Sequence, residues 1–176
     1  MGITMIHLYT GEGKGKTSAA IGLSIRAAGR GFQVCFAQFM KGNDTGELHV
    51  FERLPNVTVL RSEKNFGFYH AMSESDRAEL AEIHDRMLDR LLEMAESGAC
   101  RVFVLDEVTY PVKWKLLDME KLKRLLEFGK SEEIELVMTG RDAEERLRDA
   151  ADYLTEMACV RHPFERGTEA RRGIEF

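Results

Sequence analysis

The chain has 176 residues, of which 25 are basic and 30 acidic, giving a formal net charge of −5, and this length suits one domain with a sizeable core. With 44% hydrophobic and 31% charged residues, the composition is that of a globular protein and excludes a disordered chain. The acidic balance argues against a dedicated nucleic-acid-binding protein, which would present an excess of basic side chains.

The N-terminal half predicts strands that alternate with helices. A β-rich strand runs into a glycine- and lysine-rich loop, and an amphipathic helix follows. The second strand is mostly apolar, as expected for a strand covered on both faces. In chain order the predicted elements are a strand at 3–10, the loop at 11–17, a helix at 18–30, a strand at 33–40, a short helix at 47–54 and a strand at 57–61.

The C-terminal half continues the alternation. Residues 62–72 predict irregular structure, and Ser73 with Asp76 has the pattern of a capping box. We then expect a helix to residue 97, a strand at 101–105, a helix at 118–129, a strand at 135–139, a helix at 143–154 and a short strand at 158–162. This order predicts one α/β domain over residues 1–176. The expected fold is P-loop NTPase-like (RecA-like), with a mostly parallel sheet of about five to six strands and helices on both faces.

The N-terminus lacks the basic stretch and long apolar run of a secretory signal. No segment approaches the roughly 18 apolar residues of a membrane helix. The three cysteines, Cys35, Cys100 and Cys159, are widely spaced, as expected for reduced thiols. We therefore expect a cytoplasmic protein that binds neither membranes nor nucleic acid. The five histidines show no metal-ligand spacing and are predicted to be structural or surface residues.

The strongest chemical signal is the loop between the first strand and the first helix, which is the context that a P-loop requires. Its glycines allow backbone amides to surround phosphate oxygens, and the helix N-terminus adds positive potential. Lys16 and Lys14 supply charge, and the Thr17 hydroxyl is a candidate ligand of Mg²⁺. The predicted phosphate-binding residues are Gly11, Glu12, Gly13, Lys14, Gly15, Lys16, Thr17 and Ser18.

This loop departs from the ordinary P-loop. Thr10 stands where the common motif has its first glycine, and glycine alternates at positions 11, 13 and 15 instead. The sequence therefore predicts a specialised phosphate site. The alternative, a glycine-rich turn with incidental lysines, does not account for the strand before it and the helix after it.

Polar residues at the ends of two later strands are further candidates. Asp106 and Glu107 follow an apolar strand, where an acidic residue of a P-loop protein holds Mg²⁺ or its water. Neighbouring residues of a strand point to opposite faces, so the sequence leaves open which carboxylate binds the metal. Arg141 follows the fifth strand and is either a ligand contact or a surface charge. Arg26, on the first helix, faces either phosphate or solvent.

Several segments together resemble one family, the ATP:corrinoid adenosyltransferases. The loop with Ala19-Ala20 resembles that family's TGxGKGKTTAA pattern. Four further segments are similar to its motifs in the same order: AQFMKG at 37–42 (QFxKG), VLDEVTY at 104–110 (VLDExxY), TGR at 139–141, and the C-terminal run at 164–176 that ends in GIEF. The matches cover nearly the whole chain, and the ordered set is specific.

The resemblance implies a reaction: transfer of the 5′-deoxyadenosyl group of ATP to cobalt(I) of a corrinoid, with release of triphosphate. The corrinoid would be cobalamin, cobinamide or cobyrinic acid a,c-diamide, and the pathway adenosylcobalamin biosynthesis or salvage. The resemblance further implies ATP bound in reverse along the loop, Mg²⁺, a flavoprotein or reduced flavin that reduces cobalt(II) to cobalt(I), and a homodimer. Lys16, Lys14 and Thr17 would be the catalytic residues.

The family also carries a GFTW-like loop whose aromatic side chains displace the lower ligand of cobalt. The nearest match here is Asn65-Phe66-Gly67-Phe68, so the resemblance implies that Phe66 and Phe68 contact the corrinoid. Phe68 stands where bacterial members often have tryptophan. The alternative is that both rings simply pack on the core.

Two other P-loop functions remain as alternatives. A small-molecule kinase would need a base beside an acceptor hydroxyl and would release ADP. A RecA-like ATPase module would need basic loops that face DNA, which the acidic balance does not favour.

Overall fold

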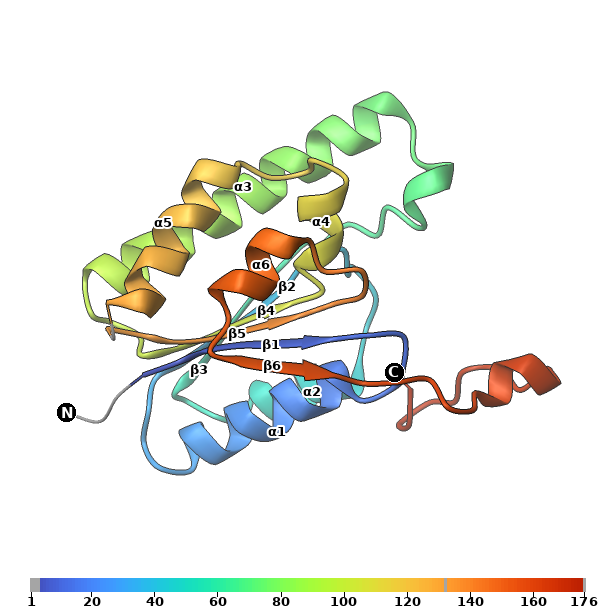
Figure 1. Ribbon diagram of the computed structural model, residues 1–176, viewed down its shortest axis with the longest axis horizontal. Coiled ribbons are helices and arrows are strands. Elements are labelled where there is room, and N and C mark those ends of the chain that lie inside the picture. Colours follow the sequence, from blue (N-terminus) through green and yellow to red (C-terminus); the bar gives the residue numbers. More distant parts are fainter. Residues whose placement is uncertain (1–3, 132, 176) are drawn as a thin grey trace.

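The computed structural model describes residues 4–131 and 133–175. Its centre is a six-stranded, all-parallel sheet with the strand order β3-β2-β4-β5-β1-β6, shown in Figure 1. The strands are β1 (Ile6–Thr10), β2 (Val34–Gln38), β3 (Val57–Arg61), β4 (Val102–Asp106), β5 (Glu135–Thr139) and β6 (Tyr153–Glu156). The predicted α/β fold class is confirmed.

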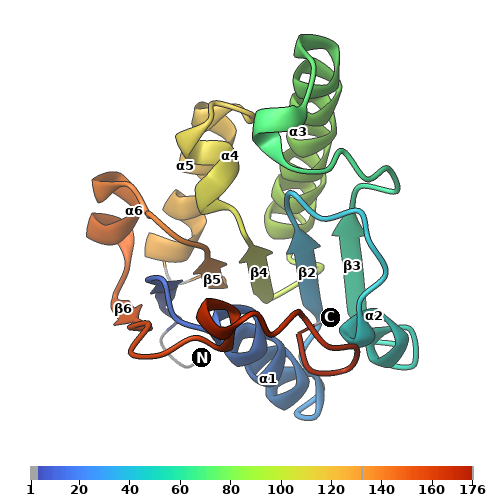
Figure 2. The same cartoon turned by 90° about the vertical axis from the view of Figure 1, so that its right-hand side faces the viewer.

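Helices cover both faces of the sheet (Figures 1 and 2). One face carries α1 (Lys16–Ala28) and α2 (Gly46–Phe51). The other carries α3 (Glu74–Glu96), α4 (Thr109–Lys113), α5 (Met119–Lys130) and α6 (Glu145–Ala150). A short 3₁₀ helix, η1 (Tyr69–Ala71), lies between β3 and α3, and a second, η2 (Pro163–Arg166), lies in the C-terminal segment after β6. Among the described residues, no helix is both long and apolar enough to span a bilayer.

The core lies mainly between the sheet and the α3–α5 layer. All five residues of β2 and of β4 are buried, because these central strands are covered on both faces. On the opposite face, α1 turns Ala20, Ser24 and Ala28 toward the sheet. These small side chains let the helix lie close to the strands, so the loop before α1 is held at the carboxyl end of β1.

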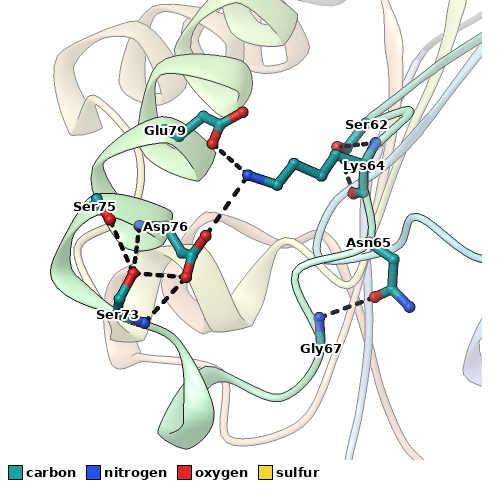
Figure 3. Close-up of polar contacts among 8 residues, drawn as sticks. All are labelled: Ser62, Lys64, Asn65, Gly67, Ser73, Ser75, Asp76 and Glu79. Carbon is teal, nitrogen blue, oxygen red and sulfur yellow. Dashed lines mark hydrogen bonds and ion pairs between the residues drawn. The ribbon is translucent and has the colours of Figure 1, made fainter.

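The start of α3 confirms the predicted capping box (Figure 3). Ser73 Oγ accepts a hydrogen bond from Asp76 N at 3.1 Å, and Asp76 Oδ2 accepts one from Ser73 N at 3.2 Å. Such a cap contributes about 1 kcal/mol by satisfying amides that the helix leaves open. The same helix end anchors the irregular segment before it.

Two predicted elements near the C-terminus are wrong. The predicted helix at 143–154 ends at Ala150, and the sixth strand is Tyr153–Glu156 rather than 158–162. Asp152 decides this, because its carboxylate accepts a hydrogen bond from Ile6 N at 2.8 Å and its own N–H donates to Ile6 O at 2.8 Å. These contacts align the following residues beside β1. The short helix α4 was not predicted, since five residues show too little periodicity.

Candidate functional site

The phosphate loop lies where β1 ends and α1 begins. Gly15 stands at the N-cap with φ of 118°, a conformation that favours glycine. The Lys16 ammonium donates to two loop carbonyls, Gly11 O at 2.6 Å and Gly13 O at 2.7 Å. Burial lowers the pKa of Lys16, and the nearby Arg141 lowers it further, while the carboxylates of Glu107 and Glu12 oppose this. The loop therefore holds a buried ammonium at its centre.

Asp106, at the end of β4, is fully buried and is hydrogen-bonded through both oxygens. Its Oδ1 accepts from Thr17 Oγ1 at 2.8 Å and from Thr139 Oγ1 at 2.7 Å. Its Oδ2 forms an ion pair with Lys41 Nζ at 2.6 Å. Asp106 thus joins the loop to the ends of β2 and β5, and it fixes the direction of the Thr17 hydroxyl.

Glu107 has a different environment from its neighbour. Its backbone lies in the left-handed region at φ 61°, and its N–H donates to Thr139 Oγ1 at 2.9 Å. The buried Oε2 oxygen of Glu107 has no hydrogen-bond partner in the described part of the chain. Burial and the adjacent Asp106 raise the pKa of this carboxyl, against the opposing charges of Lys41, Lys16 and Arg141. Glu107 is therefore the carboxylate with an oxygen left for a ligand.

Arg141 follows Gly140 at the end of β5 and lies beside the phosphate loop. Its guanidinium pairs with Glu12 of the loop, with Nη1 and Oε2 3.1 Å apart, and both side chains are about half exposed. An exposed ion pair of this kind is weak. The Arg141 guanidinium therefore lies at the loop, and its weak pairing with Glu12 leaves it available to contact a ligand.

The segment between β3 and α3 presents its two phenylalanines differently. Phe66 packs against Met72, Leu80 and Leu116, and Lys64 Nζ lies 4.4 Å from the centre of its ring. Lys64 also reaches Glu79 of α3, with Nζ and Oε2 2.5 Å apart (Figure 3). Phe68, by contrast, is 88% exposed. Phe66 is anchored to the core, and Phe68 projects into solvent.

The C-terminal segment returns to the phosphate loop after β6. Gly13 N donates to Met157 O at 2.6 Å, and Lys14 Nζ pairs with Glu175 at 2.8 Å and donates to Ile174 O at 3.1 Å. A cavity of about 320 Å³ lies between loop and segment. The segment is thus part of the site; the residues that line this cavity include Gly13, Lys14, Cys159, Arg161, His162 and Arg171.

Comparison with known proteins decides the family. A family model described as ATP:corrinoid adenosyltransferase BtuR/CobO/CobP matches residues 3–176. The chain belongs to this family. The resemblance in the motifs is thereby confirmed, and the protein is an ATP:corrinoid adenosyltransferase with ATP and a corrinoid as its substrates.

Curated relatives agree over nearly the whole chain. The corrinoid adenosyltransferase of Sinorhizobium sp is 30% identical over 173 residues, which are 98% of this chain and 80% of that protein. The Pseudomonas aeruginosa relative of the same name is 32% identical, covering 99% and 84%. The corrinoid adenosyltransferase CobA of Salmonella typhimurium is 33% identical, covering 98% and 85%.

The adenosyltransferase fold brings most of the predicted residues to one end of the sheet. The loop residues, Asp106, Glu107 and Arg141 all lie at the carboxyl ends of the strands. The segment between β3 and α3, which contains Phe66 and Phe68, lies at the same end but on the α3 side (Figure 1). Arg26 is in the last turn of α1, about 15 Å along the helix from Lys16, and is not brought to the loop.

Sequence reasoning missed three contributors to this site. Lys41 and Thr139 both bind Asp106, and Glu175 binds Lys14. Lys41 and Thr139 stand inside the QFxKG-like and TGR motifs, which were the available signals. Among the described residues, no three His, Cys, Asp or Glu side chains gather as a preformed metal centre.

Proposed function

We propose that this enzyme transfers the 5′-deoxyadenosyl group of ATP to cobalt(I) of a corrinoid and releases triphosphate. The observation that carries the proposal is the buried Lys16 ammonium at the centre of the loop, with Lys14 and Arg141 near it. A site with this concentration of positive charge suits a leaving group as highly charged as triphosphate.

The chemistry assigns simple tasks to these residues. The electron pair of cobalt(I) forms the bond to the 5′ carbon, and the bond from that carbon to the α-phosphate oxygen breaks. Cobalt(I) has no proton to lose, so no general base is needed. The chain must align the two reactants and stabilise the charge that develops on the triphosphate. Lys16, Lys14 and the loop amides serve this second task, with Thr17 and Ser18 at the start of α1.

We propose Thr17 and Glu107 as the protein ligands of Mg²⁺. The unpartnered, buried Oε2 of Glu107 fits a cation ligand, and Asp106 directs the Thr17 hydroxyl through a hydrogen bond. Asp106 itself is satisfied by three donors, so we assign it the role of orienting Thr17. When bound, Mg²⁺ would neutralise charge on the phosphates.

We propose that Phe66 and Phe68 contact the corrinoid and favour loss of its lower ligand. The exposure of Phe68 supports this role, since an aromatic side chain so open to solvent is available to a large apolar substrate. Phe66, anchored by Lys64 and the core, would fix the position of the segment.

The wider setting is also a proposal. We infer that residues 1–176 act as one catalytic domain, that the enzyme works as a cytoplasmic homodimer in adenosylcobalamin biosynthesis or salvage, and that a flavoprotein or reduced flavin supplies the electron for cobalt(I). Sedimentation at micromolar concentration tests the dimer, and a purely monomeric species would contradict it.

The deciding experiment is an anaerobic assay. The protein is mixed with ATP, Mg²⁺ and chemically reduced cob(I)alamin, the visible spectrum is followed, and the phosphate product is identified. We expect a light-sensitive adenosylated corrinoid and one triphosphate per turnover. If ATP binds but neither cobalamin nor cobinamide is adenosylated, the proposed reaction is wrong.

A further inference from the structure

His84 is a buried histidine that links three parts of the molecule. It lies in α3 with 1% of its surface exposed, and its Nδ1 is 2.8 Å from Leu116 O, in the connection between α4 and α5. A carbonyl oxygen only accepts, so the proton of the ring is on Nδ1. The unprotonated Nε2 accepts the N–H of Met40 at 3.4 Å. The ring is thus a neutral bridge between two backbone groups.

The residue that His84 holds has an unusual backbone. Met40 follows β2 with φ of 58°, in the left-handed region that residues with a side chain rarely adopt. The Phe39 ring beside it packs against the His84 ring, with the centroids 5.2 Å apart. Contacts from outside the local sequence favour this turn. The Met40 side chain packs against two apolar clusters, and its N–H donates to His84 Nε2, which is the contact that holds the backbone itself.

The turn determines where the next side chain goes. Lys41 follows Met40 directly, and its Nζ lies 2.6 Å from Asp106 Oδ2. Lys41 is the positive charge that pairs with this buried carboxylate, and it also opposes the rise in the pKa of Glu107. A change in the turn at Met40 would withdraw that charge from the two adjacent carboxylates at the end of β4, Asp106 and Glu107.

We infer that His84 is a positioning residue for adenosyl transfer: its Nε2 holds the left-handed turn at Met40 that delivers Lys41 to Asp106. The inference rests on the proposed function for the roles of Asp106 and Glu107 near the triphosphate. Within the described part of the chain, both hydrogen bonds of His84 go to backbone groups, and the residue acts through Lys41. Burial lowers the pKa of His84 to about 4, so the bridge stays neutral at physiological pH.

Two substitutions separate the two hydrogen bonds of His84. His84→Asn keeps a donor near the position of Nδ1 and loses the acceptor for Met40 N. His84→Gln places a carbonyl oxygen near the position of Nε2 and keeps that acceptor. Met87→Ala is the matched control, since Met87 is buried one turn further along α3 and packs in the apolar core.

The test is a double-mutant cycle with Lys41→Ala in the anaerobic assay. We expect His84→Asn to lower kcat about tenfold, His84→Gln to restore most of it, and Met87→Ala to leave kcat within about twofold. His84→Asn combined with Lys41→Ala should be no slower than Lys41→Ala alone. Rate losses that multiply in the double variant would overturn the inference.

A second measurement does not depend on the reaction. The rate at which an amine-reactive reagent modifies Lys41 is followed by mass spectrometry of the intact and digested protein. Held against Asp106, Lys41 should react slowly in the unmodified protein and in Met87→Ala, and several times faster in His84→Asn. Equal rates in all three would reject the role of His84, even if the adenosylation assay had itself failed. Failure of that assay with a faster Lys41 would instead count against the proposed reaction alone.

Discussion

The hydroxyl of Thr17 donates to Asp106 Oδ1 at 2.8 Å, across 89 positions of the sequence. The same oxygen accepts from Thr139, and Lys41 pairs with the other oxygen, so three segments at the end of the sheet share one buried carboxylate. This contact separates the roles of two neighbouring acids. Both oxygens of Asp106 bind side chains of the protein, whereas the Oε2 oxygen of Glu107 has no partner among the described residues.

Glu107→Gln should therefore weaken metal use without weakening the fold. Removing the charged oxygen is expected to raise the Mg²⁺ concentration for half-maximal activity at least tenfold. Burial raises the pKa of Glu107 in the folded state, so ionisation costs stability as pH rises above the ordinary value of 4.5. The glutamine variant should be as stable as the unmodified protein, or more stable, at pH 7 in urea unfolding.

Asp106→Asn is the matched comparison. It should lower the free energy of unfolding by about 3 kcal/mol, because it leaves Lys41 beside a neutral group and disturbs the bonds from both threonines. If the two variants shift Mg²⁺ dependence equally and Glu107→Gln unfolds more easily, the division of roles between Asp106 and Glu107 is wrong.

Lys16→Ala should abolish activity, because the triphosphate leaving group loses the ammonium that stabilises its charge. The loss of the central ammonium is expected to lower kcat by about 10²–10³. Lys14→Ala should cost less, since Lys14 is half exposed and held by Glu175 of the C-terminal segment. Both rates are measured with cob(I)alamin in excess. A Lys16→Ala variant that loses only affinity for the corrinoid would contradict the assignment.

Phe66→Ala and Phe68→Ala should differ in stability but agree in one kinetic trait. Phe66 packs in a small core cluster, so its truncation should cost about 1–3 kcal/mol, whereas that of the exposed Phe68 should cost less than about 0.5 kcal/mol. Relative to the unmodified protein, both variants should lose less activity with pre-reduced cobalt(I) than with a cobalt(II) corrinoid that is reduced in the assay by reduced flavin. Equal losses in the two assays would show that neither ring displaces the lower ligand.

Gly140→Ala should be strongly destabilising. Gly140 has φ of 144°, and a Cβ there would meet Thr109 Oγ1 at 1.9 Å. We expect a loss of several kcal/mol in urea unfolding and displacement of Arg141 from the phosphate loop. Gly22→Ala is the control, because it lies within α1 with open space around it and should stabilise the helix by about 0.5–1 kcal/mol.

His84 should make the protein sensitive to acid. Its pKa is about 4 when folded and 6.5 in the unfolded chain, with burial as the main cause and the charge of Asp85 opposing it. Below pH 6.5 the unfolded state binds a proton at His84, whereas the folded state stays unprotonated down to about pH 4. The free energy of unfolding therefore falls between these two pH values, by about 3 kcal/mol in all. His84→Gln should lose less stability over this range in unfolding experiments at several pH values.

Sequence reasoning was most successful where a pattern is long or strongly local. The strand β5 has the predicted bounds, and β2 and β4 lie within a few residues of theirs, because buried parallel strands appear as apolar runs. The strand β3 also has the predicted bounds, although its residues are only partly buried. The capping box of Ser73 and Asp76 is equally local. The segment at 151–162 was misassigned because a short segment fits helix or strand until its pairing with β1 is known.

By itself, the sequence determined the alternation of strands and helices, the phosphate loop and the family motifs, since each depends on residues close together in the chain. Only the tertiary structure decided which acid is free, because Thr17, Lys41 and Thr139 reach Asp106 from three distant segments. It also decided the role of His84. A lone histidine carries no pattern, and its function comes from the two backbone groups that folding brings to its ring.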